Sequence, residues 1–272
     1  MRVAVVGHVE WVTFARVAHV PKAGEIVHAR ESWAQAAGGG AVAVAELGRL
    51  AREHGDTALF FTAVGDDEVG RGVRDALEAR ALDVRAAMRA APHTRVLTFL
   101  DDEGERAITV LAPPLAPSGA DALGWSALDT CDAVYFCKGD AEALRQARRA
   151  RVLVATARAL AVIREAGVPL DVLVRSARDA GEAYAPGDLV RAPSAVVSTE
   201  GADGGCYETR DGVRARWPAA TAPHSLADAY GAGDTFAAAL TFALGAGRAL
   251  PAALAFAAER AALALGRRGG GS

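Results

Sequence analysis

The sequence contains few of the residues that mark a disulfide-linked protein or a zinc protein. Only three cysteines occur among 272 residues. Cys131 and Cys137 bracket an extended run and would lie about 20 Å apart at roughly 3.3 Å per residue, whereas a disulfide needs Cα atoms within about 7 Å. No Cys/His cluster has the spacing of a zinc site. We therefore expect free, buried thiols and a cytoplasmic location.

Long apolar runs and an excess of basic residues are also missing. No run of 18 apolar residues occurs, so we expect no membrane span, and the N-terminal residues lack the features of a secretory signal. The net charge is −3 and the sequence pI is about 6.1. Nucleic-acid-binding domains are usually basic, so we expect no nucleic-acid partner.

Two familiar nucleotide-binding motifs are absent as well. The chain has no GxxxxGK[ST] sequence, which excludes a P-loop kinase. Residues 2–7 predict a buried first strand ending in glycine, but His8 and Val9 follow in place of a GxGxxG turn. A dinucleotide-binding dehydrogenase is therefore a weak interpretation.

The most informative stretch is Asp-Ala-Tyr-Gly-Ala-Gly-Asp-Thr-Phe at residues 228–236, which precedes an apolar helical run over 236–244. The glycines allow a sharp turn, and the amides of Gly231, Ala232 and Gly233 would stand at a helix N-terminus, where anions bind. The carboxylate of Asp234 beside such a site suits the removal of a proton from an alcohol during phosphoryl transfer. A loop that ends in an N-cap aspartate is the alternative interpretation.

The order of the predicted elements indicates an α/β fold. A strand over 57–64, a helix to about residue 80 and a strand over 82–84 form a βαβ unit, which implies a parallel sheet. Further strands are predicted over 132–137, 151–155, 171–175 and 195–199. A hairpin over 94–111 and a strand over 25–30 predict a small accessory sheet, and two alanine-rich helices over 235–244 and 251–265 precede a frayed tail at 267–272.

The 228–236 stretch resembles the second signature of the ribokinase-like sugar kinases, the PfkB carbohydrate kinase family. Looser resemblances occur in family order, at 21–25, at 35–40 and in Thr199-x-Gly201-x-x-Gly204. The resemblance covers almost the whole chain. It implies a single three-layer α/β/α domain over residues 1–272, with a mainly parallel central sheet and a β-sheet lid formed by about 8–30 and 94–111.

The resemblance also assigns roles to residues. It implies that Asp234 is the catalytic base and that Gly231, Ala232 and Gly233 form the anion hole. The remaining implied contacts are to substrate from Glu10, Gly38, Gly39, Gly40, Arg95 and Asp234, to nucleotide from Thr199, Gly201, Gly204, Gly231 and Gly233, and to a metal, through water, from Ser176 and Asp179. From the residues alone, Glu10 could also be a solvated loop acid, and Arg95 could equally be a solvated edge arginine.

Two departures from the family leave the substrate open. The asparagine that usually follows the paired glycines is missing from residues 41–45, and Ser176 and Asp179 stand where the family has Asn-x-x-Glu. The function implied is ATP-dependent phosphorylation of a hydroxyl on a sugar or small polyol, with Mg²⁺. The alternatives are a nucleoside kinase, a sugar-phosphate kinase and a catalytically weak nucleotide or sugar sensor. A monovalent-cation requirement and a homodimer formed through the lid stay open.

Overall fold

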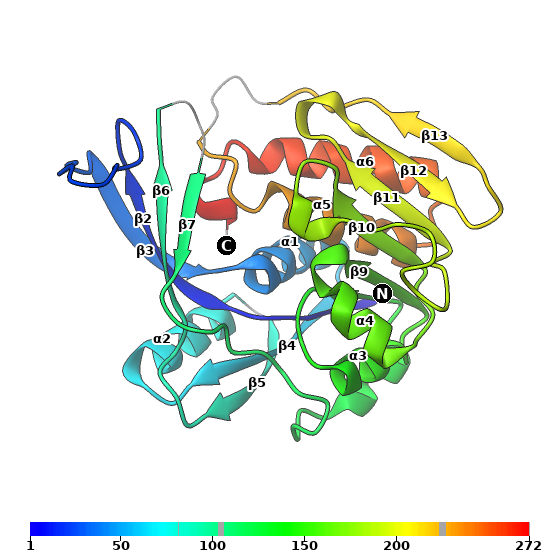
Figure 1. Ribbon diagram of the computed structural model, residues 1–272. Coiled ribbons are helices and arrows are strands. Elements are labelled where there is room, and N and C mark those ends of the chain that lie inside the picture. The colour runs from blue at the N-terminus through cyan, green and yellow to red at the C-terminus, as the bar shows by residue number, and fades with distance from the viewer. Residues whose placement is uncertain (81, 103–105, 223–226, 272) are drawn as a thin grey trace.

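A central sheet with helices on both faces stands beside a smaller sheet (Figure 1). The computed structural model describes residues 1–80, 82–102, 106–222 and 227–271. The predicted mixed α/β fold with a mainly parallel sheet is confirmed. Nowhere in the described ranges is a helix both long and apolar enough to cross a bilayer.

The central sheet has nine strands, and the pairs from β5 across to β11 are parallel. The last two strands extend it as an antiparallel hairpin. In sheet order the strands are β13 (Arg214–Trp217), β12 (Gly205–Thr209), β11 (Ala195–Thr199), β10 (Val172–Ser176), β9 (Val152–Thr156), β8 (Ala133–Phe136), β1 (Arg2–Val6), β4 (Thr57–Gly65) and β5 (Asp83–Arg89).

Alternating side chains of the buried strands supply two hydrophobic cores. Val3 and Val5 of β1 face one helical layer, whereas Ala4 and Val6 face the other. The first layer contains α1 (Gly39–Glu53), α2 (Glu68–Glu78), α5 (Ala232–Gly245) and α6 (Leu250–Ala264). The second contains α3 (Ala141–Ala147) and α4 (Leu160–Ala166), and the 3₁₀ turns are η1 (Trp125–Thr130), η2 (Ala157–Ala159), η3 (Ala180–Glu182), η4 (Gly201–Asp203) and η5 (Arg268–Gly271).

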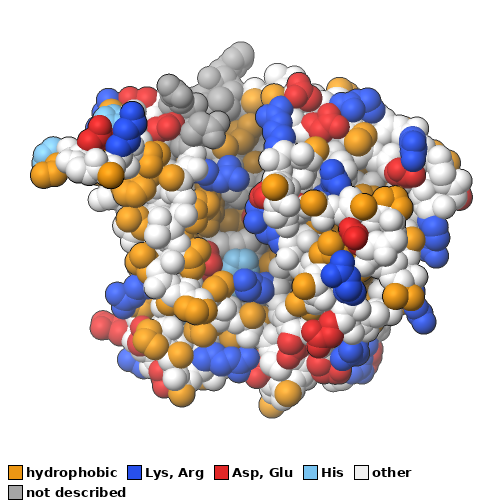
Figure 2. Space-filling model, viewed as in Figure 1, with side chains coloured by type: hydrophobic (Ala, Val, Ile, Leu, Met, Phe, Trp, Pro, Cys, Tyr) orange, Lys and Arg blue, Asp and Glu red, His pale blue; other side chains and the backbone are white. Residues whose placement is uncertain are grey.

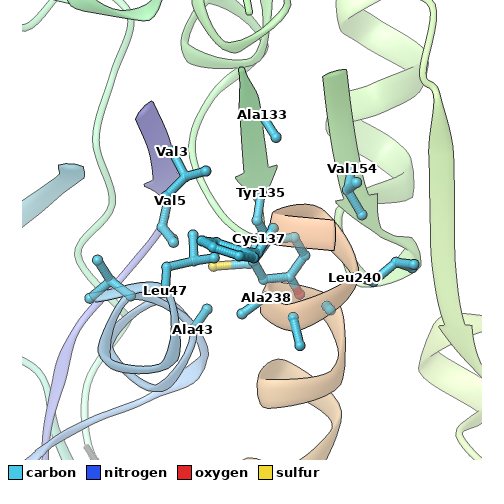
Figure 3. Close-up of a cluster of buried hydrophobic side chains, with 14 of the residues drawn as sticks. Val3, Val5, Ala43, Leu47, Ala133, Tyr135, Cys137, Val154, Ala238 and Leu240 are labelled. Atoms are coloured by element: carbon cyan, nitrogen blue, oxygen red, sulfur yellow. The ribbon is translucent and has the colours of Figure 1, made fainter. Parts of the chain in front are cut away.

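Small side chains let α1 and α5 lie side by side under the middle of the sheet (Figure 3). Ala43 of α1 and Ala238 of α5 are both fully buried in this core, together with Tyr135 and Cys137 from the end of β8. The close packing brings the N-termini of two helices to the same edge of the sheet, where the parallel strands end.

The second sheet has the order β3-β2-β6-β7, with β2 and β6 parallel. Its strands are β2 (Glu10–Arg16), β3 (Glu31–Ala37), β6 (Arg95–Leu100) and β7 (Arg106–Val110). The predicted hairpin over 94–111 is present, and its turn residues 103–105 lie outside the described part of the chain. The predicted strand over 25–30 is wrong.

The segment before β3 cannot act as a lid strand because it has no buried side. Ile26 is 89% exposed, and the Glu25 carboxylate accepts a hydrogen bond from the Lys22 amide at 3.1 Å, which closes a turn. The strand begins later, at Glu31. Its sequence has no β-branched residue, and its alanines do not alternate regularly with polar residues, so the sequence does not reveal a strand.

The C-terminal segment differs from the predicted frayed tail. Residues 268–271 form η5, in which Gly269 and Gly270 are buried and adopt positive φ angles of 56° and 73°. The Gly269 amide donates to Asp228 Oδ2 at 2.9 Å. Lacking side chains, these glycines pack closely against Phe14 and Val42, contacts that composition alone does not reveal. Ser272 lies outside the described residues.

Candidate active site

The N-terminus of α5 begins with a glycine that no other residue could replace without strain. Gly231, the N-cap, has a φ of 73°, and a methyl group added to it would lie 2.8 Å from Val42 Cγ1. Helix geometry leaves the first-turn amides of Ala232, Gly233 and Asp234 without intrahelical partners. A methyl group at Gly233 would meet no atom within 4 Å. This helix end is therefore open and suited to an anion.

The N-terminus of α1 meets the same carboxylate from the other side. A methyl group at Gly39 would lie 2.8 Å from Asp234 Oδ1. Burial raises the pKa of Asp234 to about 6, although the charges of Arg158 and Arg106 act in the opposite direction and Glu182 raises it further. Asp234 is thus largely ionised at neutral pH, yet it is more basic than an ordinary aspartate.

Glu10, at the start of β2, is the second carboxyl group of the site. Glu10 is only 8% exposed, and a methyl group added to Gly38 would lie 3.0 Å from Glu10 Oε2. Burial raises the pKa of Glu10 to about 7, while Lys138 lowers it and Asp234 raises it. Glu10 is therefore a buried carboxyl group beside the glycines at the start of α1, a position compatible with a contact to substrate. The alternative interpretation of Glu10 as a solvated loop residue is excluded by this burial.

His8 lies beside Glu10 at the end of β1. Its Nε2 atom is 3.8 Å from Glu10 Oε1, which is too long for a hydrogen bond. Burial lowers the pKa of His8 to about 4, and Lys138 and Arg158 lower it further, so the ring is neutral at neutral pH. Its Nδ1 atom is buried and has no partner among the described residues.

Tyr230 connects the two helix N-termini. Its hydroxyl accepts a hydrogen bond from the Gly38 amide at 3.0 Å, so that this amide is used within the protein. The Tyr230 amide donates in turn to Asp228 Oδ1 at 2.9 Å. Asp228 therefore ties the turn before α5 to the C-terminal segment. Gly40 has a packing role, because a methyl group there would lie 2.5 Å from the His8 carbonyl oxygen.

A hollow separates the small sheet from the body of the molecule, and charged side chains of both signs line it (Figure 2). Arg106 of β7 reaches toward this side: its Nη1 atom donates to the Ala229 carbonyl at 3.4 Å, and its charge lowers the pKa of Asp234. The small sheet therefore contributes an arginine, but at a position that the sequence did not suggest.

Arg95 lies elsewhere. It pairs in register with Trp11, while the neighbouring Val12 and Val96 face the core that contains Tyr230. Its Nη2 atom lies 3.9 Å from Asp67 Oδ2, and it lines a separate hollow of about 320 Å³ together with Trp11 and Val69. The structure does not bring Arg95 to the other predicted residues, because strand alternation turns it to the opposite face.

The predicted nucleotide loop follows β11. Thr199 donates through Oγ1 to the Arg175 carbonyl at 3.3 Å, and Gly201 is exposed with a φ of 67°. A methyl group at Gly204 would lie 2.2 Å from the Trp217 carbonyl oxygen. The close approach of the β12–β13 hairpin explains this glycine by itself. Thr199 and Gly201 stay predicted nucleotide contacts.

Ser176 and Asp179 do not fit a metal site as they are arranged. Asp179 Oδ1 accepts the Gly181 amide at 2.8 Å, and Oδ2 pairs with Arg158. Ser176 Oγ accepts the Arg178 amide at 3.3 Å. No group of three metal-ligating side chains occurs in the part of the chain that the structure describes. The oxygen atoms of these two side chains are therefore already used within the protein.

A family model described as pfkB family carbohydrate kinase matches residues 1–184 and 167–272. The chain belongs to this family. No curated protein matched the sequence.

Solved structures of the same fold cover nearly the whole chain. The ribokinase of Thermotoga maritima is 21% identical, with a TM-score of 0.78 over 99% of this chain and 94% of that one. Ribokinase of Arabidopsis thaliana, solved with ribose and ATP, is 18% identical, with a TM-score of 0.73 over 98% and 93%. Adenosine kinase of Sinorhizobium meliloti is 18% identical, with a TM-score of 0.75 over 98% and 94%. Identities this low establish the fold alone.

Within this pfkB-family fold, the structure brings Asp234, Glu10, Gly38 and Gly39 together, as the sequence suggested. The interpretation of Asp234 as only a helix cap is not favoured, because no side-chain cap bond is formed at this helix end. Sequence reasoning missed several charged or polar neighbours, which come from five separate segments: His8, Arg106, Arg158, Glu182 and Tyr230. Only Tyr230, inside the 228–236 signature, carried a sequence signal.

Proposed function

We propose that the protein transfers the γ-phosphoryl group of ATP to a hydroxyl group of a sugar or a related small polyol. The observation that carries this proposal is the position of the Asp234 carboxylate. It stands between the N-termini of α1 and α5, beside an open amide site, with its pKa raised to about 6. A carboxylate at such a place is suited to remove a proton while the amides hold a phosphoryl group.

The residues divide the work as follows. Asp234 accepts the proton of the acceptor hydroxyl, because burial makes it a stronger base than a solvated aspartate. ATP supplies the phosphoryl group. The first-turn amides of α5 stabilise the charge that develops on the group in transfer. General-base assistance of this kind is worth roughly 10²–10⁴ in rate.

Glu10 and His8 define the other wall. Protonated Glu10 can donate a hydrogen bond to an acceptor oxygen as well as accept one, and neutral His8 offers its ring without a positive charge. This arrangement suits hydroxyl groups. Glu10 is the first residue of the small sheet, and exclusion of water by that sheet would limit wasteful hydrolysis of ATP.

The test is a panel of acceptors assayed by release of ADP: pentoses, hexoses, sugar phosphates and nucleosides. We expect sugar-dependent ADP release by the wild type and none above background by Asp234→Asn. The fold similarity to adenosine kinase makes nucleosides the first alternative. Release of ADP that no acceptor increases would contradict the proposal, because it would show hydrolysis of ATP alone. Binding of ligands with no turnover would also contradict it and would favour a sensor.

A further inference from the structure

An arginine lies on the side of the site where the metal-organising residues were expected. Arg158 belongs to η2, directly after β9, and η3 follows the adjacent parallel strand β10. The Arg158 amide donates to Thr156 Oγ1 at 3.3 Å, and this hydrogen bond fixes the start of η2. Both turns stand at the edge where the parallel strands end, which is where ligands bind in such sheets.

Two carboxylates hold the Arg158 guanidinium. Its Nε atom lies 2.8 Å from Glu182 Oε1, and its Nη2 atom pairs with Asp179 Oδ2. Backbone amides bind the other oxygen atom of each carboxylate. The Ser176 amide donates to Glu182 Oε2 at 2.6 Å, and the Gly181 amide donates to Asp179 Oδ1. The orientation of the guanidinium is therefore set by groups that are themselves held by the backbone.

The guanidinium keeps donors for a ligand. An arginine has five N–H donors, and the two ion pairs engage Nε and Nη2, so Nη1 has no partner among the described residues. The side chain is 60% exposed. Its charge affects Asp234 more strongly than that of Glu182 does, and it also affects His8. Arg158 thus stands near enough to the site for its charge to act on both Asp234 and His8.

We propose that Arg158, clamped by Asp179 and Glu182, binds the β- or γ-phosphate of the nucleotide in the place where Asp179 was expected to organise a metal. Guanidinium groups suit this task because their planar fork matches phosphate oxygens. Asp179 and Glu182 are then positioning residues for Arg158. The inference rests on the proposed function, since it names the residue that holds the phosphoryl donor.

The experiment compares binding of a β,γ-imido analogue of ATP and of adenosine, by calorimetry at saturating Mg²⁺. We expect Arg158→Ala to weaken binding of the analogue roughly 10-fold to 100-fold, the value of a charge-assisted hydrogen bond, with adenosine binding unchanged. Arg158→Lys keeps the positive charge between the carboxylates and should retain part of the affinity, which tests the contact even if Arg158→Ala loosens the turn.

Arg164→Ala is the matched control. Arg164 lies on α4, is 55% exposed and is 3.9 Å from Asp188 Oδ1, so its loss also breaks an exposed aspartate pair, but away from the site. It should bind the analogue as the wild type does. The proposal is overturned if Arg158→Ala binds the analogue with wild-type affinity, or if its effect is confined to the KM of the acceptor.

The two failures can be told apart. If the wild type phosphorylates an acceptor and Arg158→Ala binds the analogue normally, this inference fails and the proposed function stands. If the wild type transfers no phosphoryl group but the analogue binds and Arg158→Ala weakens it, the phosphate contact stands and the proposed function fails.

Discussion

Two pairs of carboxylates border the site, and their surroundings differ. Glu10 and Asp234 are removed from water, and within the described residues neither has an arginine or lysine partner within 4.0 Å. Asp179 and Glu182 share one arginine. The first pair has raised pKa values of about 7 and about 6, whereas the second is held in a fixed geometry by its cation.

The difference shows which carboxylates can exchange protons at neutral pH. Desolvation without a counterion disfavours the charged form and brings a carboxyl group into the working range of a base. A carboxylate that accepts charge-assisted hydrogen bonds from a guanidinium serves to orient that partner. Proton chemistry is therefore expected from the first pair alone, and the largest effects should follow from its loss.

The largest expected effect is that of Asp234→Asn. Asparagine keeps the size of the side chain but cannot accept the proton, so kcat should fall roughly 10²–10⁴-fold. Asp179→Asn, in the paired set, should lower kcat no more than about tenfold, because Glu182 still holds Arg158. Steady-state kinetics with a saturating acceptor measures both. Equal losses in the two variants would break the distinction between the pairs.

Two glycine variants separate position from charge in the first pair. A methyl group at Gly39 displaces the Asp234 carboxylate, so Gly39→Ala should lower kcat by about 10², as misplacements near 1 Å do. A methyl group at Gly72, within α2, meets nothing within 4 Å. Gly72→Ala should keep full activity and stabilise the protein by about 0.5–1 kcal/mol. Wild-type kcat in Gly39→Ala would mean that the carboxylate acts from another position.

The glycines and the aspartate of the first pair could be predicted because their roles follow from local backbone geometry. A glycine-rich turn before a helical run predicts an open helix N-terminus wherever it occurs. The layers of the fold could also be predicted from the sequence, since buried parallel strands appear there as short runs of β-branched residues. The strand Glu31–Ala37 could not be predicted in this way, because it contains no β-branched residue and most of its apolar residues are alanines.

The sequence suggested Asp179 as a metal contact, but its pairing with Glu182 around Arg158 could not be predicted, because that pairing depends on contacts between separate segments. Arg158 and Asp179 are 21 positions apart and meet only because β9 and β10 are neighbours in the sheet. Arg106 reaches Ala229 across 123 positions. The sequence suggested Arg95 and gave no sign of Arg106. Both open strands of one hairpin, and only the register decides which of them faces the site.

Stability should report the desolvation of Glu10. Its folded-state pKa of about 7 lies above the 4.5 of an ordinary glutamate, so the folded protein binds the proton more tightly and loses stability as pH rises between these values. Glu10→Gln cannot ionise and should be more stable than the wild type above pH 7, by on the order of 2 kcal/mol after screening, from about 1.4 kcal/mol per pKa unit.

Urea unfolding at pH 5 and pH 8 measures the effect, which should shrink toward zero near pH 4.5. Glu78→Gln is the control, because Glu78 forms an exposed pair with Arg74 and its loss should change stability by less than about 0.5 kcal/mol at either pH. A Glu10→Gln variant that is less stable at pH 8 would show that the Glu10 carboxylate has a partner that outweighs its burial.

The smallest expected effect is the acid limb of the pH–rate profile. A base with a pKa of about 6 is only about one-tenth ionised at pH 5, so kcat should fall roughly tenfold between pH 7 and pH 5. An ordinary aspartate would stay almost fully ionised over this range. Glu10→Gln should keep the limb in place, because Glu10 is already protonated below its own pKa of about 7. If the acid limb of the wild type instead lay at about pH 4, Asp234 would be solvated when the acceptor is bound. The raised pKa that assigns proton transfer to Asp234 would then be lost, and with it the difference between the two pairs of carboxylates.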